Sequence, residues 1–291
     1  MSLLMKIRLL ITAILTAMAL NCAEASVRTS PQDSLIYTRT IQELLPYAGL
    51  PAGELMVRAA GMFYGTPYKG GTLETVPEAL TVNLHETDCI LLVETCTAMT
   101  LLLQECSDGG TPSFEDFCAM LSTLRYRDGI TDGYPSRMHY TSEWLLQAQD
   151  NGFLKEVTAE LGGIPLNQVF SFMSSHRDNY PRLREDDGAL GLIRRAEERL
   201  DTAAAYFYIP SEKIPEIEGN ILNGDIICFV STVSGLDITH TGIACREEDG
   251  SLHFIHASMK EGKVVLETRT LAEYARSGIR VARLNDISKN R

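Results

Sequence analysis

Cys89 stands between a loop-forming segment and a long apolar run, a setting that suits a nucleophilic thiol. Residues 64–72 are rich in Gly and Pro and cannot form a regular element. Residues 90–104 contain neither Gly nor Pro and predict a buried helix. The unpaired N–H groups and positive dipole end at the start of such a helix favour the thiolate, which is the nucleophilic form. The alternative is a small buried Cys in the core.

A catalytic Cys needs a base within hydrogen-bond reach and a third group that holds the base. Two histidines fall on predicted strands near the C-terminus: His240 opens one strand and His256 ends the next. If these strands pair as a hairpin, the two side chains lie near each other. His253 is three residues from His256, so it lies on the opposite face of a flat strand and is left out of the site.

Residues 125–144 crowd Arg, Tyr, His, Asp and the single Trp into one stretch. One interpretation is a loop pinned by Arg–Asp pairs with aromatic rings tucked beneath it. The other is the wall of a binding cleft, with flat rings for stacking and arginines that pair with carboxylates. The candidate substrate-binding residues in this stretch are Arg137, His139, Tyr140 and Trp144.

The apolar periodicity predicts helices in the first two thirds of the chain and strands in the last third. Helices are expected over residues 34–47, 50–62, 90–104, 142–149 and 188–200, and after a capping box at Ser113 and Asp116. Strands are expected over residues 225–233, 239–246, 252–258 and 264–266. This order predicts an α+β fold with an antiparallel meander, in a single catalytic domain over residues 26–291.

Residues 1–25 have a basic start, a short apolar core and a small-residue end, which predicts a cleaved secretory signal peptide. An alternative makes Cys22 a lipid-anchored N-terminus. No other segment is apolar enough to span a membrane after signal cleavage, so the product is expected to be periplasmic or secreted.

The net charge of −12 argues against nucleic-acid binding, because proteins that bind nucleic acids carry clustered positive charge. No Cys-x-x-Cys spacing occurs among the seven Cys residues, and neither a metal nor a cofactor is expected. Free buried thiols are the default for the cysteines other than Cys89, although an oxidising compartment also permits a disulfide.

Several motifs in order resemble the N-acetylmuramoyl-L-alanine amidase-like proteins, an amidase branch related to the NlpC-type, papain-like cell-wall cysteine peptidases. The motifs are residues 65–74, Asp88-Cys89 with Val93-Glu94, residues 125–129, residues 136–140, residues 237–242 and residues 256–258. The resemblance implies a papain-like core whose nucleophile helix packs on the sheet, with an insertion over about residues 107–219 that shapes the cleft.

The resemblance also implies a cysteine hydrolase of peptidoglycan-derived muropeptides. The Cys89 thiolate would attack the amide between N-acetylmuramic acid and L-Ala. His240 would hold this thiolate as an ion pair and then protonate the leaving amine, and His256 would fix the tautomer and orientation of His240. The Cys89 backbone N–H would bind the oxyanion, with Tyr68 and Asp88 beside the site.

Two other functions remain open from the sequence. The same catalytic residues would serve an endopeptidase that cleaves within the stem peptide after D-Glu. The second is a catalytically inactive protein that kept the scaffold and only binds the cell envelope. The joint presence of Cys89, His240 and His256 argues against this function.

Overall fold

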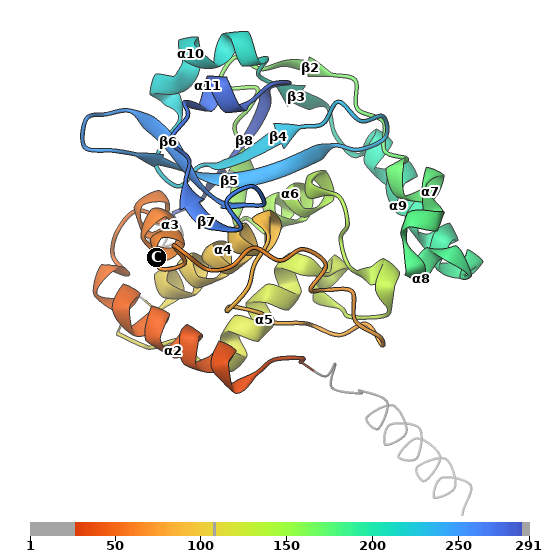
Figure 1. Cartoon of the computed structure of the whole chain (residues 1–291), viewed down its shortest axis with the longest axis horizontal. Helices are drawn as coiled ribbons and strands as arrows, with labels where there is room; N and C mark the ends of the chain where they lie inside the picture. Colours follow the sequence, from red (N-terminus) through yellow and green to blue (C-terminus); the bar gives the residue numbers. More distant parts are fainter. Residues whose placement is uncertain (1–26, 107–108, 287–291) are drawn as a thin grey trace, which may run out of the picture.

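A six-stranded antiparallel sheet forms the upper layer of the molecule in Figure 1, with helices on both faces. The computed structural model describes residues 27–106 and 109–286. The signal segment predicted over residues 1–25, including Cys22, lies outside the described residues. The strands run in the spatial order β1 (Leu154–Glu156), β8 (Ile279–Leu284), β4 (Ile226–Val230), β5 (Ile238–Arg246), β6 (Leu252–Ser258) and β7 (Lys263–Leu266). A separate pair is formed by β2 (Ile164–Leu166) and β3 (Tyr206–Tyr208).

The longer helices lie below the sheet in Figure 1 or at its side. They are α2 (Pro31–Leu44), α3 (Ala52–Gly61), α4 (Cys89–Glu105), α5 (Phe114–Arg125), α6 (Thr141–Asp150) and α9 (Asp187–Ala203). Four short helices are α7 (Phe172–Ser175), α8 (Pro181–Arg184), α10 (Ile214–Ile217) and α11 (Leu271–Tyr274). Helices α10 and α11 cover the upper face of the sheet (Figure 1).

Helix α4 is the centre of the larger hydrophobic core. Every residue from Leu91 to Gln104 in this helix is buried, because α3, α5 and the lower face of the sheet surround it. Alternate residues of β4 divide between two cores: Ile226 and Cys228 join the one around α4, and Ile227 and Phe229 join the one beneath α10 and α11. This period-2 alternation is what a sheet covered on both faces requires.

The predicted α+β class is confirmed, and the predicted helices and meander strands are present. The capping box is also confirmed, since the Ser113 hydroxyl accepts from the Asp116 N–H while the Asp116 carboxylate accepts from the Ser113 N–H. The prediction omitted β1, β2, β3 and β8. Strand β8 carries Arg280 at a fully buried position, where Glu156 of β1 and the Ser142 hydroxyl satisfy its guanidinium.

The segment over residues 107–219 contributes directly to the sheet. It supplies β1 at the sheet edge beside β8, and Ile209 forms an isolated bridge to Ile279. The same segment supplies α5 and α6, which pack against the helical core and β1. The chain therefore completes its central sheet only after both this segment and the C-terminal strand are in place.

Candidate active site

Cys89 is the first residue of α4, as predicted. Its predecessor Asp88 is the N-cap, and the Asp88 Oδ1 accepts from the Leu91 N–H at 3.0 Å. The loop that carries Tyr68 runs alongside this helix start through a parallel bridge between Tyr68 and Thr87. Because Cys89 is in the first turn, its backbone N–H has no acceptor within the helix and is available to an oxyanion.

The expected thiolate form of Cys89 is wrong for the resting structure. Burial raises the pKa of the Cys89 thiol to about 11, and the neighbouring Asp88 carboxylate raises it further, whereas Thr241 and the Ile90 backbone lower it. The helix terminus cannot compensate, because its N-cap is itself an acidic side chain that faces the same N–H groups. The resting thiol is therefore protonated at neutral pH.

The two predicted histidines lie in contact. His240 Nε2 is 2.7 Å from His256 Nδ1, and the two rings are nearly perpendicular. The β4–β5 register shifts between Phe229 and Val230, so Thr239 is skipped and His240 pairs opposite Phe229. Such an irregularity re-aims the side chains beside it, and here it places the His240 ring against the Phe229 ring.

Both imidazoles are neutral. Burial lowers the pKa of His240 to about 3, helped by the nearby His256, and burial lowers the pKa of His256 to about 4. His256 is 1% exposed, and its Nε2 faces the Glu267 carboxylate at 3.6 Å. Sequence reasoning missed Glu267, because its approach to His256 depends on the β6–β7 register and on no local motif.

The Cys89 sulfur lies beside Thr241, the residue after His240, so the start of α4 contacts the strand that carries His240. The Thr241 backbone and hydroxyl lie beside the Cys89 thiol and lower its pKa, although the hydroxyl makes no hydrogen bond of good geometry within the described residues. The Tyr274 ring of α11 contacts both imidazoles, with centroids 5.9 Å from His240 and 5.5 Å from His256. Burial raises the pKa of Tyr274, and the charge of a Cys89 thiolate adds to this effect.

Tyr68 belongs to the same neighbourhood. Burial raises the pKa of the Tyr68 phenol, and negative charge on Cys89 and Asp88 raises it further. The phenol is therefore a protonated donor at neutral pH, as the predicted near-site role requires.

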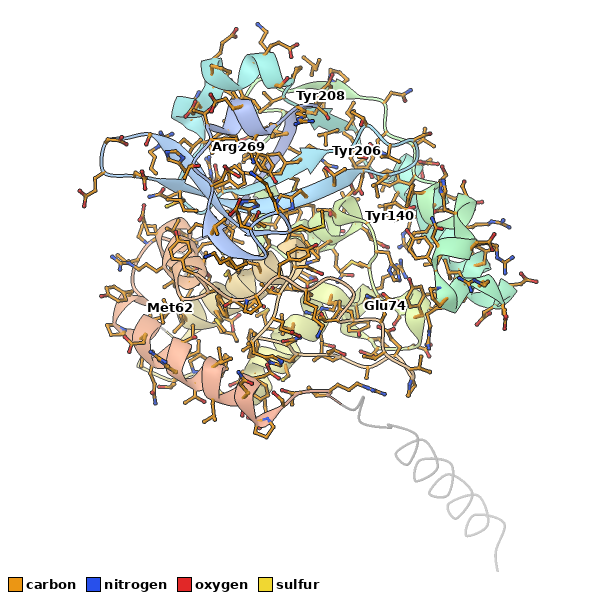
Figure 2. All side chains as sticks on the ribbon, viewed as in Figure 1. Met62, Glu74, Tyr140, Tyr206, Tyr208 and Arg269 are labelled. Atoms are coloured by element: carbon orange, nitrogen blue, oxygen red, sulfur yellow. The ribbon has the colours of Figure 1, made fainter. Side chains whose placement is uncertain are left out.

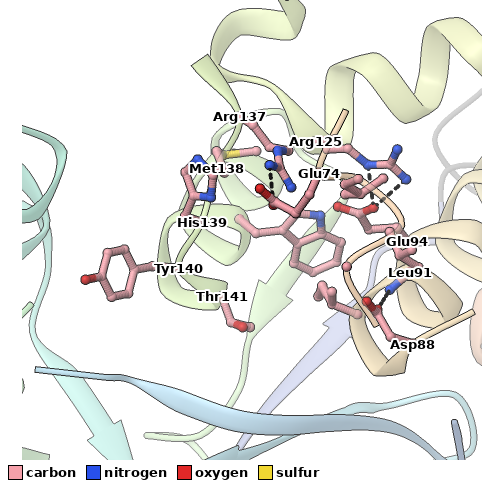
Figure 3. A pocket seen from close by; sticks show the side chains of 14 residues that line it. Glu74, Asp88, Leu91, Glu94, Arg125, Arg137, Met138, His139, Tyr140 and Thr141 are labelled. Atoms are coloured by element: carbon pink, nitrogen blue, oxygen red, sulfur yellow. Dashed lines mark hydrogen bonds and ion pairs between the residues drawn. The ribbon is translucent and has the colours of Figure 1, made fainter. Parts of the chain in front are cut away.

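A cavity of about 220 Å³ opens beside the start of α4 (Figure 3). Asp88 and Leu91 line it from α4, and all four candidate binding residues line it from the other side: Arg137, His139, Tyr140 and Trp144. The predicted cleft wall therefore shares this cavity with Asp88 and Leu91, which lie on either side of Cys89 in the chain, whereas Cys89, His240 and His256 are not among the lining residues. Glu74, Glu94 and Arg125 complete the charged lining.

Most polar atoms on this wall already have partners. Arg137 pairs with Glu74 at 2.8 Å and with Glu78 at 3.1 Å, so its charge is not open to a substrate carboxylate. In Figure 3 the Tyr140 ring points away from Glu74, and Tyr140 Oη donates to Glu197 at 2.7 Å.

His139 Nε2 lies 3.0 Å from the carbonyl oxygen of Tyr134, and burial lowers the pKa of its imidazole to about 3. The Trp144 Nε1 differs: it is buried and has no hydrogen-bond partner in the described part of the chain. Of the four candidates, Trp144 thus offers an open donor at the cavity.

The described residues also bear on the remaining cysteines, on metal binding and on membrane spans. All the cysteines there are free thiols, in agreement with the default expectation. No cluster of three or more His, Cys, Asp or Glu suitable for a metal ion occurs within residues 27–106 and 109–286. Within those same ranges, no helix has the length and hydrophobicity that crossing a membrane would require.

A family model described as N-acetylmuramoyl-L-alanine amidase-like matches residues 58–279, which contain the whole site. The chain belongs to this amidase-like family. Its predicted resemblance to the family is confirmed, and the family model spans the candidate nucleophile Cys89, both candidate histidines and the cavity wall. A comparison with curated proteins returns no match.

Several solved structures share the fold of this chain, and one of them is described as an amidase. A crystal structure of an N-acetylmuramoyl-L-alanine amidase from Bacteroides uniformis is 34% identical, with a TM-score of 0.74, over 80% of this chain and 99% of that one. A structure from Bacteroides fragilis described as a putative xylanase is 38% identical, with a TM-score of 0.71, over 77% and 98%. A Legionella pneumophila protein at 21% identity and a TM-score of 0.64 shares the fold.

Proposed function

We propose that this member of the amidase-like family is a cysteine-dependent N-acetylmuramoyl-L-alanine amidase. It hydrolyses the amide between the lactyl group of N-acetylmuramic acid and L-Ala in peptidoglycan-derived muropeptides. The observation that most supports the proposal is that the Cys89 thiol at the start of α4 lies beside Thr241, the neighbour of His240 in β5, while His240 is hydrogen-bonded to His256. We also propose that the core is papain-like, of the NlpC type, because a nucleophile helix packs on an antiparallel sheet that supplies the base.

The chemistry starts from a neutral pair. As the Cys89 sulfur attacks the amide carbonyl carbon, His240 takes the thiol proton, so a free thiolate is never required. The Cys89 backbone N–H and the Tyr68 hydroxyl donate to the oxyanion. The imidazolium of His240 then protonates the leaving amine of L-Ala, and the C–N bond breaks to leave a lactyl thioester. Water, deprotonated by His240, hydrolyses the thioester and restores the thiol.

The cavity beside α4 is the proposed binding region for the part of the muropeptide next to the scissile bond. Its open donor is the Trp144 Nε1, which would donate to a substrate carbonyl or hydroxyl oxygen. Arg137, His139 and Tyr140 are proposed to shape this wall, since their polar atoms are held by neighbouring groups. The predicted signal peptide would deliver the protein to the periplasm or the exterior, where such fragments occur.

One observation favours the endopeptidase as a second candidate. Asp88 lines the cavity directly beside Cys89 and forms no ion pair among the described residues, so it suits a free ammonium group. An enzyme that cleaves after D-Glu would use such a group to hold the free amine of an N-terminal L-Ala.

Digestion of defined muropeptides, with products weighed by mass spectrometry, separates these functions. The amidase releases the sugar from the intact stem peptide, whereas the endopeptidase releases a dipeptide. Cys89→Ala and His240→Ala are expected to abolish turnover, and His256→Ala to reduce it less. Full activity in Cys89→Ala would overturn the cysteine mechanism. Normal muropeptide binding by a parent protein without turnover would identify an envelope-binding protein.

A further inference from the structure

Glu267 is fixed beside His256 through both its backbone and its side chain. Its N–H donates to the Phe254 carbonyl oxygen at 2.9 Å, and its own carbonyl oxygen lies 2.9 Å from His253 Nδ1. Arg269 grips its carboxylate with two N–H groups, at 3.0 Å from Nε to Oε1 and 2.9 Å from Nη2 to Oε2. These hydrogen bonds lower the pKa of Glu267 to about 2, so its carboxylate is ionised at neutral pH.

The ionised carboxylate determines which nitrogen of His256 carries the proton. Glu267 Oε2 lies 3.6 Å from His256 Nε2, and this buried nitrogen has no other polar partner within the described residues. A bare Nε2 lone pair would face the carboxylate charge and be repelled by it. A protonated Nε2 is attracted to the same charge, so His256 takes the Nε2–H tautomer.

The tautomer of His256 then fixes that of His240. With its proton on Nε2, His256 offers the Nδ1 lone pair as an acceptor, and His240 Nε2 lies 2.7 Å from it. His240 must donate through Nε2–H, because two lone pairs at that distance would repel each other. In the neutral imidazole of His240 this leaves Nδ1 without a proton, as the nitrogen that can accept one.

We propose that Glu267 is a positioning residue of this centre, which sets the tautomer of His256 and, through it, makes Nδ1 of His240 the base for the Cys89 thiol. The role of that base rests on the proposed cysteine mechanism, whereas the tautomers do not. When His240 becomes an imidazolium, its positive charge lies at one end of the series of contacts His240–His256–Glu267, and the Glu267 carboxylate lies at the other end. The Glu267 carboxylate, 3.6 Å from His256 Nε2, then stabilises the positive charge that develops on the imidazole pair.

Other charged and titratable groups face His256 from each neighbouring element. Arg269 opposes protonation of the imidazole, and Glu261 in the β6–β7 turn favours it. Tyr274 of α11 packs against the ring, with the Arg269 guanidinium 4.6 Å from the Tyr274 centroid. Glu261 therefore gives a matched control, since it acts on the same imidazole by charge without contacting it.

The decisive substitution is Glu267→Gln. Arg269 can still donate to the amide oxygen, which turns the amide NH2 toward His256 Nε2 and favours a lone pair there. His256 then protonates on Nδ1, His240 is forced to protonate on its own Nδ1, and the base is lost. Glu267→Asp keeps a carboxylate and is the conservative rescue, while Glu261→Gln removes a nearby charge and keeps the chain of contacts.

Nitrogen-15 NMR of the imidazoles in the full folded chain tests the tautomers without any substrate. We expect the proton of His256 on Nε2 in the parent, in Glu267→Asp and in Glu261→Gln, and on Nδ1 in Glu267→Gln. A parent His256 protonated on Nδ1, or a tautomer that Glu267→Gln leaves unchanged, would overturn the inference. Circular dichroism and thermal unfolding verify that each variant is folded.

Kinetics test the consequence for catalysis. Glu267→Gln should lower kcat on the order of 100-fold with KM nearly unchanged, as expected for a base held in the wrong tautomer. It should also slow iodoacetamide alkylation of Cys89, read from the Cys89 peptide by mass spectrometry. Glu261→Gln should leave both rates near the parent values. Parent-like kcat and alkylation in Glu267→Gln would contradict the inference, whereas a parent inactive on every muropeptide would contradict only the proposed function.

Discussion

At the scale of single residues, the proposed catalytic pair of Cys89 and His240 is neutral rather than an ion pair. Burial raises the pKa of Cys89 to about 11 and lowers the pKa of His240 to about 3, so both shifts disfavour charge separation at rest. The penalty is the cost of placing two charges in a poorly solvated site. In the proposed mechanism, proton transfer therefore accompanies attack on the substrate, and the oxyanion donors offset the cost of charge separation.

This arrangement predicts the pH dependence of turnover. The active form of His240 is the deprotonated one, and because its folded-state pKa lies below 6.5, that form persists at more acidic pH than in a free imidazole. We expect kcat/KM on a soluble muropeptide to stay constant from neutral pH down through 6.5 and to fall only at clearly lower pH. An acid limb centred at or above pH 6.5 would show that the imidazole is not buried as described.

At the scale of elements, the β5–β6 pairing brings the histidines together only because Gly242 has no side chain. A Cβ built at Gly242 would lie 2.7 Å from Phe254 Cδ2 and 3.5 Å from His256 Cβ. The first distance is a collision between a strand residue and a buried ring. The β6 strand must approach this closely for His256 to reach His240, so the glycine is part of the site's construction.

We therefore expect Gly242→Ala to lower both stability and turnover. Overpacking of this kind costs about 1–3 kcal/mol of unfolding free energy. A shift of β6 away from β5 would lengthen the contact between the two imidazoles, so kcat should fall more than stability alone explains. Urea denaturation and muropeptide kinetics measure the two effects. Gly49→Ala, where a Cβ meets nothing within 4 Å, is the control. Parent-like kinetics in Gly242→Ala would contradict this account.

At the scale of the whole molecule, a helical half and a sheet half meet at the site. Figure 2 shows Glu74 in the lower, helical half and Arg269 in the upper half with the sheet. The cavity belongs to the first half and the His256–Glu267 contact to the second. Buried imidazoles occur on both sides, in His139 as well as in His240 and His256. Because they are neutral when folded, the stability of the folded state depends on pH.

His139 provides a test of this coupling. Burial and the nearby Arg137 lower its pKa from 6.5 to about 3, so between these values the unfolded chain binds a proton that the folded chain does not. This contribution to stability is present above pH 6.5 and is lost as pH falls toward 3. Between neutral pH and pH 5, the free energy of unfolding of the parent should fall by on the order of 1–2 kcal/mol more than that of His139→Gln, as measured by urea denaturation. An equal loss in both proteins would contradict the prediction.

The sequence by itself predicted the longer helices, the meander strands and the candidate reacting groups. The apolar run after Cys89 could only be a buried helix, and the Ser113–Asp116 capping box located the next helix. Turn signals separated the strands that carry His240 and His256. These features are local: periodicity, capping and turn chemistry act between residues close in the chain, so they can be recognised without knowing the fold.

Only the tertiary structure decided the electrostatics and the supporting contacts. Burial beside Asp88 outweighs the helix terminus and keeps the Cys89 thiol protonated. Arg137 was predicted to bind the substrate, but its guanidinium forms ion pairs with Glu74 and Glu78. Glu267 reaches His256 through strand register. Each of these depends on how much water is excluded and on which distant groups come within a few ångströms, and neither quantity is set by residues that are neighbours in the sequence.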